Sequence, residues 1–185
     1  MNTLWSVVTS AASGVLATVF LSCSRRGRRI VGHWCRYPKR YLRRRRQEQL
    51  RQLAEQAQPG AECQGWLTDP VDKDTVGAEV TISGRVVGKP QDKDLWIVHR
   101  TVAPGEVWPK RRITADPDGW FTASTVEGGA FGSLAVALLL TPHAVSHDFE
   151  AWADRGRRTG RFPGFVLPAS ARELAHAVVR IDRDR

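Results

Sequence analysis

The sequence predicts a mainly β protein: an antiparallel sandwich with one short packed helix, preceded by an N-terminal transmembrane helix and a basic juxtamembrane helix. Three observations support this prediction. An uncharged stretch opens the chain, a block of Lys and Arg follows it, and short β-branched runs separated by Gly, Pro and Asp fill the remainder. We expect residues 1–23 to be a membrane anchor, residues 24–60 a juxtamembrane or stalk helix, and residues 61–185 a β-sandwich domain.

Residues 4–22, LWSVVTSAASGVLATVFLS, contain no charged side chain. As a helix they would extend about 28 Å, close to the thickness of the hydrocarbon core of a bilayer. Because all the Arg residues follow this stretch, the positive-inside rule keeps them in the cytoplasm. We therefore expect a single-pass protein of the cell inner membrane with a cytoplasmic C-terminal domain. A lipoprotein processing site ending at Cys23 is disfavoured, since no basic region precedes it and Arg25 follows almost at once.

Small residues recur along the predicted span at steps of three and four. They are Thr3, Ser6, Ser10, Ser13 and Ala17. This spacing places them on one helical face, where small side chains permit close approach of a second helix. A homo-oligomer, with self-association through Ser6, Ser10, Ser13 and Ala17, is therefore one expectation. A monomeric anchor, in which Ser and Thr bond their own backbone, is the other.

Positive charge is confined to one segment of the chain. Residues 22–46 hold 11 of the 28 Lys and Arg and none of the 19 Asp and Glu. The rest of the chain, with 17 basic and 19 acidic side chains, is close to neutral. A domain that binds nucleic acid spreads basic charge over its folded surface, whereas a basic block beside an apolar stretch is typical of a membrane surface. We therefore expect anionic membrane lipids as partners, and no nucleic acid.

Aromatic and aliphatic residues are interleaved with this basic block, so we expect the segment to lie along the cytoplasmic leaflet. Such an apolar edge lets the long cationic side chains reach lipid phosphates. The residues expected to contact the membrane are Trp5, Arg25, Arg26, Arg28, Arg29, Trp34, Arg43, Arg44, Arg45 and Arg46.

The pattern of residues 39–58, KRYLRRRRQEQLRQLAEQAQ, predicts a helix that ends at Pro59 and Gly60. We interpret this helix as a stalk, and its apolar side is also compatible with a short coiled coil. That side consists of Leu42, Leu50, Leu53 and Ala57.

The strands are predicted from short runs rich in β-branched and aromatic residues. The runs are AEVTISGRVV (78–87), DLWIVHRTVA (94–103), WPKRRITA (108–115), GWFTASTV (119–126), GSLAVALLLT (132–141) and a last strand at 174–181. Val80 and Ile82 alternate with polar residues, as in a half-buried strand. The run LAVALLL is apolar on both faces and should be a central strand.

One helix is expected to interrupt the strands after residue 141. Thr141 can cap it, Pro142 suits its first turn, and Gly156 would end it. Its apolar stripe, which should seal one end or flank of the sandwich, consists of Val145, Phe149 and Trp152.

The opposite face of this helix carries polar groups at a spacing that divalent metals use, namely His143, His147, Glu150 and Asp154. Without a second ligand-bearing segment, a solvated polar face is the favoured interpretation. His99 is likewise interpreted as a sheet-face residue and not as a base. The cysteines, Cys23, Cys35 and Cys63, are odd in number and lack CxxC spacing, so they predict neither a disulfide framework nor a zinc site. We expect no cofactor and no metal.

Several motifs between residues 66 and 183 are shared with a known group of domains. They are LWIV at 95–98, WP at 108–109, DPDGW at 116–120, VALLL at 136–140, and a tail with Phe149, Trp152, Thr159-Gly160, Pro163-Gly164 and Leu167-Pro168. With them the body resembles small immunoglobulin-like β-sandwich modules of bacteria that accompany membrane segments or sensor and effector domains. The resemblance implies a sandwich fold and an accessory role. Such modules usually continue the apolar strand with Ala-Asp, where this chain has Thr141-Pro142.

No GxSxG, P-loop, HExxH or paired-Cys pattern occurs in the chain, so the sequence does not predict an enzyme. We expect a membrane-anchored, non-enzymatic binding or sensing module with a protein partner. Segments 108–112 and 154–161 are candidate cationic contacts for an acidic partner or lipid, and ordinary surface is the favoured interpretation. The alternative function is an oligomerising membrane effector that forms a pore or perturbs the membrane under control of the sandwich.

Overall fold

The computed structural model describes residues 36–57, 62–101, 105–128 and 132–182. The chain divides into two compact units, Met1–Pro38 and Lys39–Arg185. The predicted transmembrane helix lies outside the described residues. Among the residues that are described, no helix is both long enough and apolar enough to cross a membrane.

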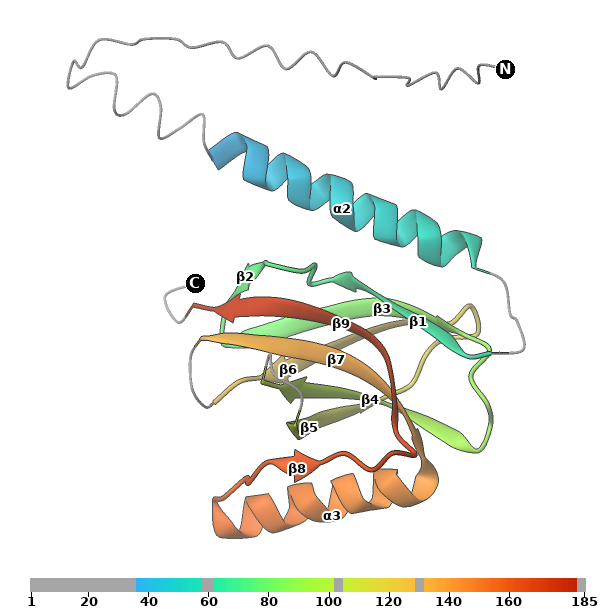
Figure 1. Cartoon of the computed structure of the whole chain (residues 1–185), viewed down its shortest axis with the longest axis vertical. Coiled ribbons are helices and arrows are strands. Elements are labelled where there is room, and N and C mark those ends of the chain that lie inside the picture. The colour runs from blue at the N-terminus through green and yellow to red at the C-terminus, as the bar shows by residue number, and fades with distance from the viewer. Residues whose placement is uncertain (1–35, 58–61, 102–104, 129–131, 183–185) are drawn as a thin grey trace, which may run out of the picture. The chain divides into compact units, whose positions relative to one another are not determined.

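The second unit is mainly β and contains two sheets, which confirms the predicted fold class at that level (Figure 1). The smaller sheet has the order β1-β3-β6, with β1 at Gln64–Asp69, β3 at Glu79–Val87 and β6 at Trp120–Val126. The larger sheet has the order β2-β9-β7-β4-β5-β8. Its strands are β2 (Thr75–Val76), β4 (Lys93–Arg100), β5 (Glu106–Ile113), β7 (Ser133–Pro142), β8 (Phe165–Val166) and β9 (Arg172–Ile181). All strand pairs are antiparallel except β2 with β9.

The strand β7 lies at the centre of the larger sheet, as its doubly apolar sequence predicts. It pairs with β4 on one side and β9 on the other. Val136 and Leu138 belong to the core shared with the smaller sheet, whereas Ala137 and Leu139 belong to a second core on the opposite face. Because side chains of a strand alternate between faces, this sequence requires cover on both sides.

Helix α3 (His143–Thr159) supplies the second cover. It follows β7 and lies against the larger sheet together with β8 (Figure 1). Its Phe149 is fully buried and packs edge-on against Trp96, with ring centroids 5.2 Å apart, and against Phe165 at 5.0 Å. The predicted stripe of Val145, Phe149 and Trp152 is therefore buried, on a flank of the sandwich.

The predicted ends of α3 are wrong, by one residue at the start, where Pro142 is the N-cap, and by four residues at the end. Thr141 does not cap the helix, because it still belongs to β7 and its hydroxyl lies between Asp94 O and Ser146 Oγ. Gly156 does not end the helix either. It lies inside α3 against the ring of Phe162, where a β-carbon would collide, and Gly160 in the left-handed region forms the C-cap instead.

A β-bulge in β5 changes which side chains face the core. Val98 pairs with Pro109 and Ile97 with Arg111, so Lys110 is an extra residue in the ladder. The insertion shifts the alternation by one, and each later side chain moves to the other face. As a result, Val107 packs in the core under α3 while Ile113 packs between the two sheets.

Helix α2 (Arg36–Gln56) occupies the region where the sequence predicts a helix. The predicted apolar side is buried only in part. Ala54 is buried, Leu50 and Ala57 are half-buried, and Leu42 and Leu53 are exposed.

Phe149 should make a large contribution to stability because it joins α3 to the larger sheet. We expect Phe149→Ala to lower the free energy of unfolding by about 3 to 5 kcal/mol, through lost apolar burial and the cavity left behind. Chemical denaturation followed by circular dichroism measures the change. His147→Ala, at an exposed position of the same helix, is the matched control and should change stability by less than about 0.5 kcal/mol. Equal losses in the two variants would contradict this packing role.

Candidate functional site

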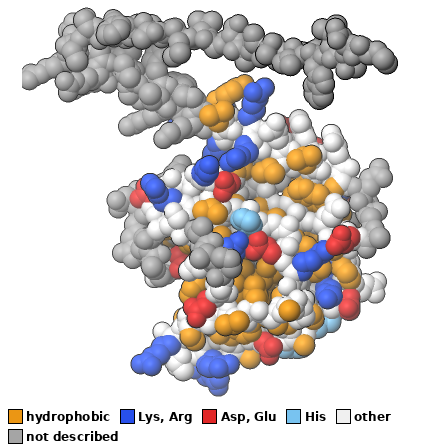
Figure 2. Space-filling model, in the orientation of Figure 1, with side chains coloured by type: hydrophobic (Ala, Val, Ile, Leu, Met, Phe, Trp, Pro, Cys, Tyr) orange, Lys and Arg blue, Asp and Glu red, His pale blue; other side chains and the backbone are white. Residues whose placement is uncertain are grey.

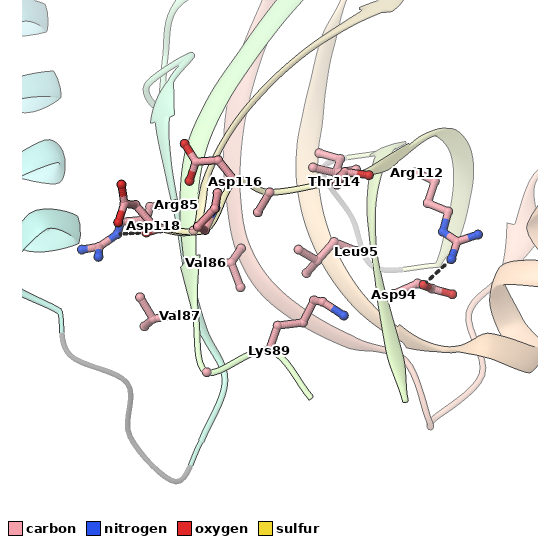
Figure 3. Close-up of a pocket in the computed structure, with 15 residues that line it drawn as sticks. Arg85, Val86, Val87, Lys89, Asp94, Leu95, Arg112, Thr114, Asp116 and Asp118 are labelled. Carbon is pink, nitrogen blue, oxygen red and sulfur yellow. Dashed lines mark hydrogen bonds and ion pairs between the residues drawn. The ribbon is translucent and has the colours of Figure 1, made fainter. Parts of the chain in front are cut away.

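Two hollows at the ends of the strands in the second unit contain charged side chains. One, of about 640 Å³, is bounded by the ends of β3 and β5, the start of β4 and the turn before β6 (Figure 3). The other, of about 780 Å³, is bounded by the end of β4, the start of β5, the end of β6, the start of β7, and α3. We call the second hollow the His99 cleft.

The charged groups around the hollow of Figure 3 are engaged in holding the fold. Asp94 Oδ1 accepts from Arg112 Nη2 at 2.7 Å, and Asp94 Oδ2 lies 2.7 Å from His143 Nδ1. Burial opposes ionisation of Asp94, but its hydrogen bonds to His143, Ser146 and Arg112 outweigh burial and lower its pKa. Arg85 is turned away from the hollow and donates to Asp118 O at 2.9 Å (Figure 3). This arrangement is structural in character.

The floor of the His99 cleft is a polar cluster around the buried ring of His99. His99 Nδ1 lies 2.8 Å from Glu127 Oε2, and His99 Nε2 lies 3.0 Å from Thr125 Oγ1. Lys110 Nζ lies 3.1 Å from the same Glu127 oxygen and donates to Val126 O at 3.2 Å. In the described residues, no fully buried side-chain nitrogen or oxygen lacks a hydrogen-bond partner. The cluster is thus internally satisfied.

Burial and neighbouring charges fix the protonation of His99. Its burial lowers the pKa, the hydrogen bond to Glu127 raises it, and the nearby charge of Lys110 lowers it, with a net decrease. The ring is therefore neutral at pH 7. Because a carboxylate can only accept, Nδ1 carries the proton, and Nε2 accepts from the hydroxyl of Thr125.

The cluster is assembled from three strands of two sheets. His99 comes from the end of β4, Lys110 from the bulge of β5, and Thr125 and Glu127 from the end of β6 and the residue after it. The bulge is what turns Lys110 toward β6, since bulges commonly redirect one side chain. Sequence analysis did not identify Thr125 and Glu127. They lie 26 and 28 residues from His99, in a different sheet, and no spacing signal connects them.

Aromatic side chains form one wall of the cleft. The indole of Trp108 donates to Phe162 O at 3.1 Å and that of Trp152 donates to Pro163 O at 2.8 Å. The rings of Trp152 and Phe162 pack at 5.4 Å. Because both indole N–H groups are bonded to the backbone, the rings present mostly carbon to the cleft. The surface elsewhere is mixed: on the face shown in Figure 2, hydrophobic side chains lie among scattered charged ones.

The polar groups at the floor of the cleft are already bonded to one another. Both ring nitrogens of His99 are engaged, and its neighbour Glu127 already bridges His99 and Lys110. Among the described residues, no group of three or more His, Cys, Asp or Glu is placed to hold a metal. The polar face of α3 divides instead into separate pairs, with His143 at Asp94, His147 at Glu150 and Asp154 at Arg157.

The residues predicted for membrane contact are described only in part. Arg43, Arg44, Arg45 and Arg46 lie on α2, where Arg43 and Arg46 meet acidic side chains of the β strands and loops. The remainder, Trp5, Arg25, Arg26, Arg28, Arg29 and Trp34, lie outside the described residues. The same holds for the predicted self-association positions Ser6, Ser10, Ser13 and Ala17. Both sets of residues stay predictions.

The predicted cationic segments take different positions. In segment 108–112, Trp108 and Lys110 line the His99 cleft, while Arg112 pairs with Asp94. In segment 154–161, Arg157 lines the cleft and pairs with Asp154.

A scan of the chain against protein-family models finds no match, and neither does a search of curated proteins.

The buried neutral His99 should make stability depend on pH. Its pKa is lowered from the ordinary 6.5, so on acidification the unfolded chain takes up a proton before the folded chain does. The resulting stabilisation is complete above the unfolded-state pKa and is lost as pH falls toward the folded-state pKa. We expect the unfolding free energy to decrease between about pH 7 and about pH 5. The unfolding free energy of the His99→Gln variant should decrease less over this interval. Urea titrations at each pH measure it, and equal decreases in the two proteins would refute a neutral, buried His99.

Proposed function

We propose that this chain is a non-enzymatic binding or sensing module of bacteria, with an immunoglobulin-like β-sandwich that binds a protein partner in the His99 cleft. We further propose that a single N-terminal helix holds it at the cytoplasmic face of the inner membrane. The observation on which the binding proposal rests is the construction of the cleft: a bonded polar floor beneath an aromatic wall.

The cleft has the features of a recognition site. Ligand sites are concave and mostly apolar, with a few fixed polar groups, and their volumes are commonly about 300 to 1,000 Å³. The volume of about 780 Å³ falls in this range. Aromatic residues are also enriched at protein interfaces. At the edge of the cleft, Val126 and Phe162 are exposed hydrophobic side chains, which a peptide segment of a partner would cover.

The fixed floor favours recognition over catalysis. A base must be able to exchange its proton with a ligand, whereas His99 is buried and bonded on both nitrogens. Lys110 and Glu127 neutralise each other nearby. Such a floor presents a fixed shape and little net charge, so that selectivity would come from fit against the aromatic wall.

The membrane placement is supported by the sequence. The uncharged stretch 4–22 and the basic residues after it match the pattern of a single-pass anchor with a cytoplasmic C-terminus.

The binding proposal can be tested with two equivalent surface valines. Val126 lies at the cleft and is 64% exposed, while Val166 lies on β8 outside the cleft residues and is 74% exposed. Peptides would be selected from a phage-displayed random library on the full-length chain. We expect Val126→Asp to weaken their binding by roughly tenfold or more, because a charge would have to be desolvated at the contact. Val166→Asp should bind as the wild type does. If both variants bind the peptides equally, the cleft is not the recognition site.

The membrane placement can be tested with paired reporters at the C-terminus. A fused green fluorescent protein should fluoresce and a fused alkaline phosphatase should stay inactive, because the positive-inside rule places residue 185 in the cytoplasm. Active phosphatase without fluorescence would contradict this topology.

A further inference from the structure

The described lining of the His99 cleft carries more positive than negative charge. Its ionised side chains are Arg100, Lys110, Arg157 and Glu127. His99 adds no charge at pH 7, because burial lowers its pKa. Lys110 and Glu127 form an ion pair, with 3.1 Å between Nζ and Oε2, and so offset each other. Arg100 and Arg157 are therefore the source of the positive surplus.

The two arginines differ in how firmly they are held. The side chain of Arg100 is 14% exposed, and it donates to Glu173 Oε2 at 3.1 Å and to the backbone oxygen of Thr101 at 3.1 Å. The side chain of Arg157 is 67% exposed, and that of its ion-pair partner Asp154 is 63% exposed. An exposed ion pair is weak, because water screens it and both side chains lose rotamer freedom. Arg157 is thus the cation of the lining that can most readily exchange its partner.

Arg157 lies beside the aromatic wall of the cleft. It belongs to the last turn of α3, one turn after Ala153, and both residues line the cleft. The residue before it, Gly156, packs against the ring of Phe162. That ring is 5.4 Å from the ring of Trp152, and Phe162 is 47% exposed. A ligand seated on Phe162 would therefore lie close to the Arg157 guanidinium.

We propose that the partner segment bound in the His99 cleft is an acidic peptide: an aliphatic or aromatic side chain packs on the aromatic wall, and a carboxylate binds Arg157 in place of Asp154. This inference rests on the function proposed for the cleft and names the class of ligand. The present partner of Arg157 is already a carboxylate, and the planar guanidinium bonds such a group through parallel N–H donors. Asp and Glu side chains and the C-terminus of a peptide all supply this group.

The surroundings favour a ligand carboxylate over that of Asp154. The pair of Arg157 with Asp154 is open to water, whereas a ligand that covers Val126 and Phe162 excludes water from the mouth of the cleft. Opposite charges attract each other more strongly where water is excluded. A basic ligand would instead meet a charge of its own sign, so the same arginine selects against it.

A peptide fits this charge better than a nucleic acid or a lipid surface does. Those polyanions are bound by several cations spread over a surface. The cleft offers one exchangeable arginine at the edge of a concave aromatic site. A single carboxylate next to an apolar side chain matches that combination.

The first test uses peptides selected on the full-length chain from a random phage-displayed library, with affinities of the synthetic peptides measured by fluorescence polarisation. We expect the selected peptides to be enriched in Asp or Glu next to an aliphatic or aromatic residue, relative to the unselected library. Arg157→Gln should weaken their binding by roughly threefold to tenfold, because an ion pair at the rim is lost. Arg158→Gln is the matched control, since Arg158 is exposed but does not line the cleft, and it should bind as the wild type does.

Further substitutions test whether the contact is direct. Exchanging the acidic residue of the peptide for its amide should weaken binding to the wild type but not to the Arg157→Gln variant, so the two losses should not add. Asp154→Asn removes the competing carboxylate and should strengthen binding by about twofold to threefold. Asp148→Asn removes an exposed carboxylate elsewhere on α3 and should change nothing. Peptides with an amidated C-terminus distinguish side-chain carboxylates from that of the chain end.

The other outcomes separate this inference from the function on which it rests. Suppose that Val126→Asp weakens binding but the peptides show no acidic enrichment, or the two losses add. Only the acidic class of ligand would then be overturned. Equal losses from Arg157→Gln and Arg158→Gln would overturn it in favour of diffuse attraction to the basic segment 154–161. If no peptide is selected, or Val126→Asp leaves binding unchanged, the function proposed for the cleft is wrong, and this inference with it.

Discussion

The architecture depends on the burial of β7 on both faces. Leu138 packs between the sheets and Leu139 packs under α3, so this one strand requires a second sheet on one side and a helix on the other. Its neighbours β4 and β9 extend the larger sheet from this centre. Successive side chains of a strand point to opposite faces. If either face of β7 were exposed to water, several aliphatic side chains would lose their burial, and each buried side chain of this kind contributes about 1.5 to 3 kcal/mol. The three layers follow from that requirement.

The bulge at Lys110 connects this architecture to the cleft. β5 begins under α3 and ends between the sheets, which a regular strand cannot do without turning a core side chain outward. The extra residue removes the conflict, and as a Lys it pairs with Glu127 across the gap to β6. β8 pairs only with Glu106 and Val107, so most of the described β5 is an edge. Pro109 and the charged residues after it are typical protection against pairing with another chain at such an edge.

The sequence predicts the long elements because apolar residues occupy the positions that become buried. The strands β3, β4, β6 and β7 and the stripe on α3 follow from it. The two-residue strands β2 and β8 are too short to show any period. The ends of α3 are not predicted correctly because Thr141 and Gly156 have the right residue types for caps but take other contacts. The Thr141 hydroxyl bonds Asp94 O and Ser146 Oγ, and Gly156 packs against the ring of Phe162. The cleft was not predictable, since His99 meets partners from another sheet, and only the register of both sheets brings them together.

The net charge of a long segment can hide a local cluster of charged side chains. Residues 47–185 are nearly neutral in sum, yet Asp69, Asp72 and Asp74 gather beside α2. The ion pairs there are partly exposed, and exposed pairs contribute only about 0 to 1 kcal/mol each and weaken with salt. The β layers, by contrast, are held by apolar burial that salt does not screen. Salt should therefore weaken the contact between α2 and the acidic side chains more than it weakens the packing of the β layers.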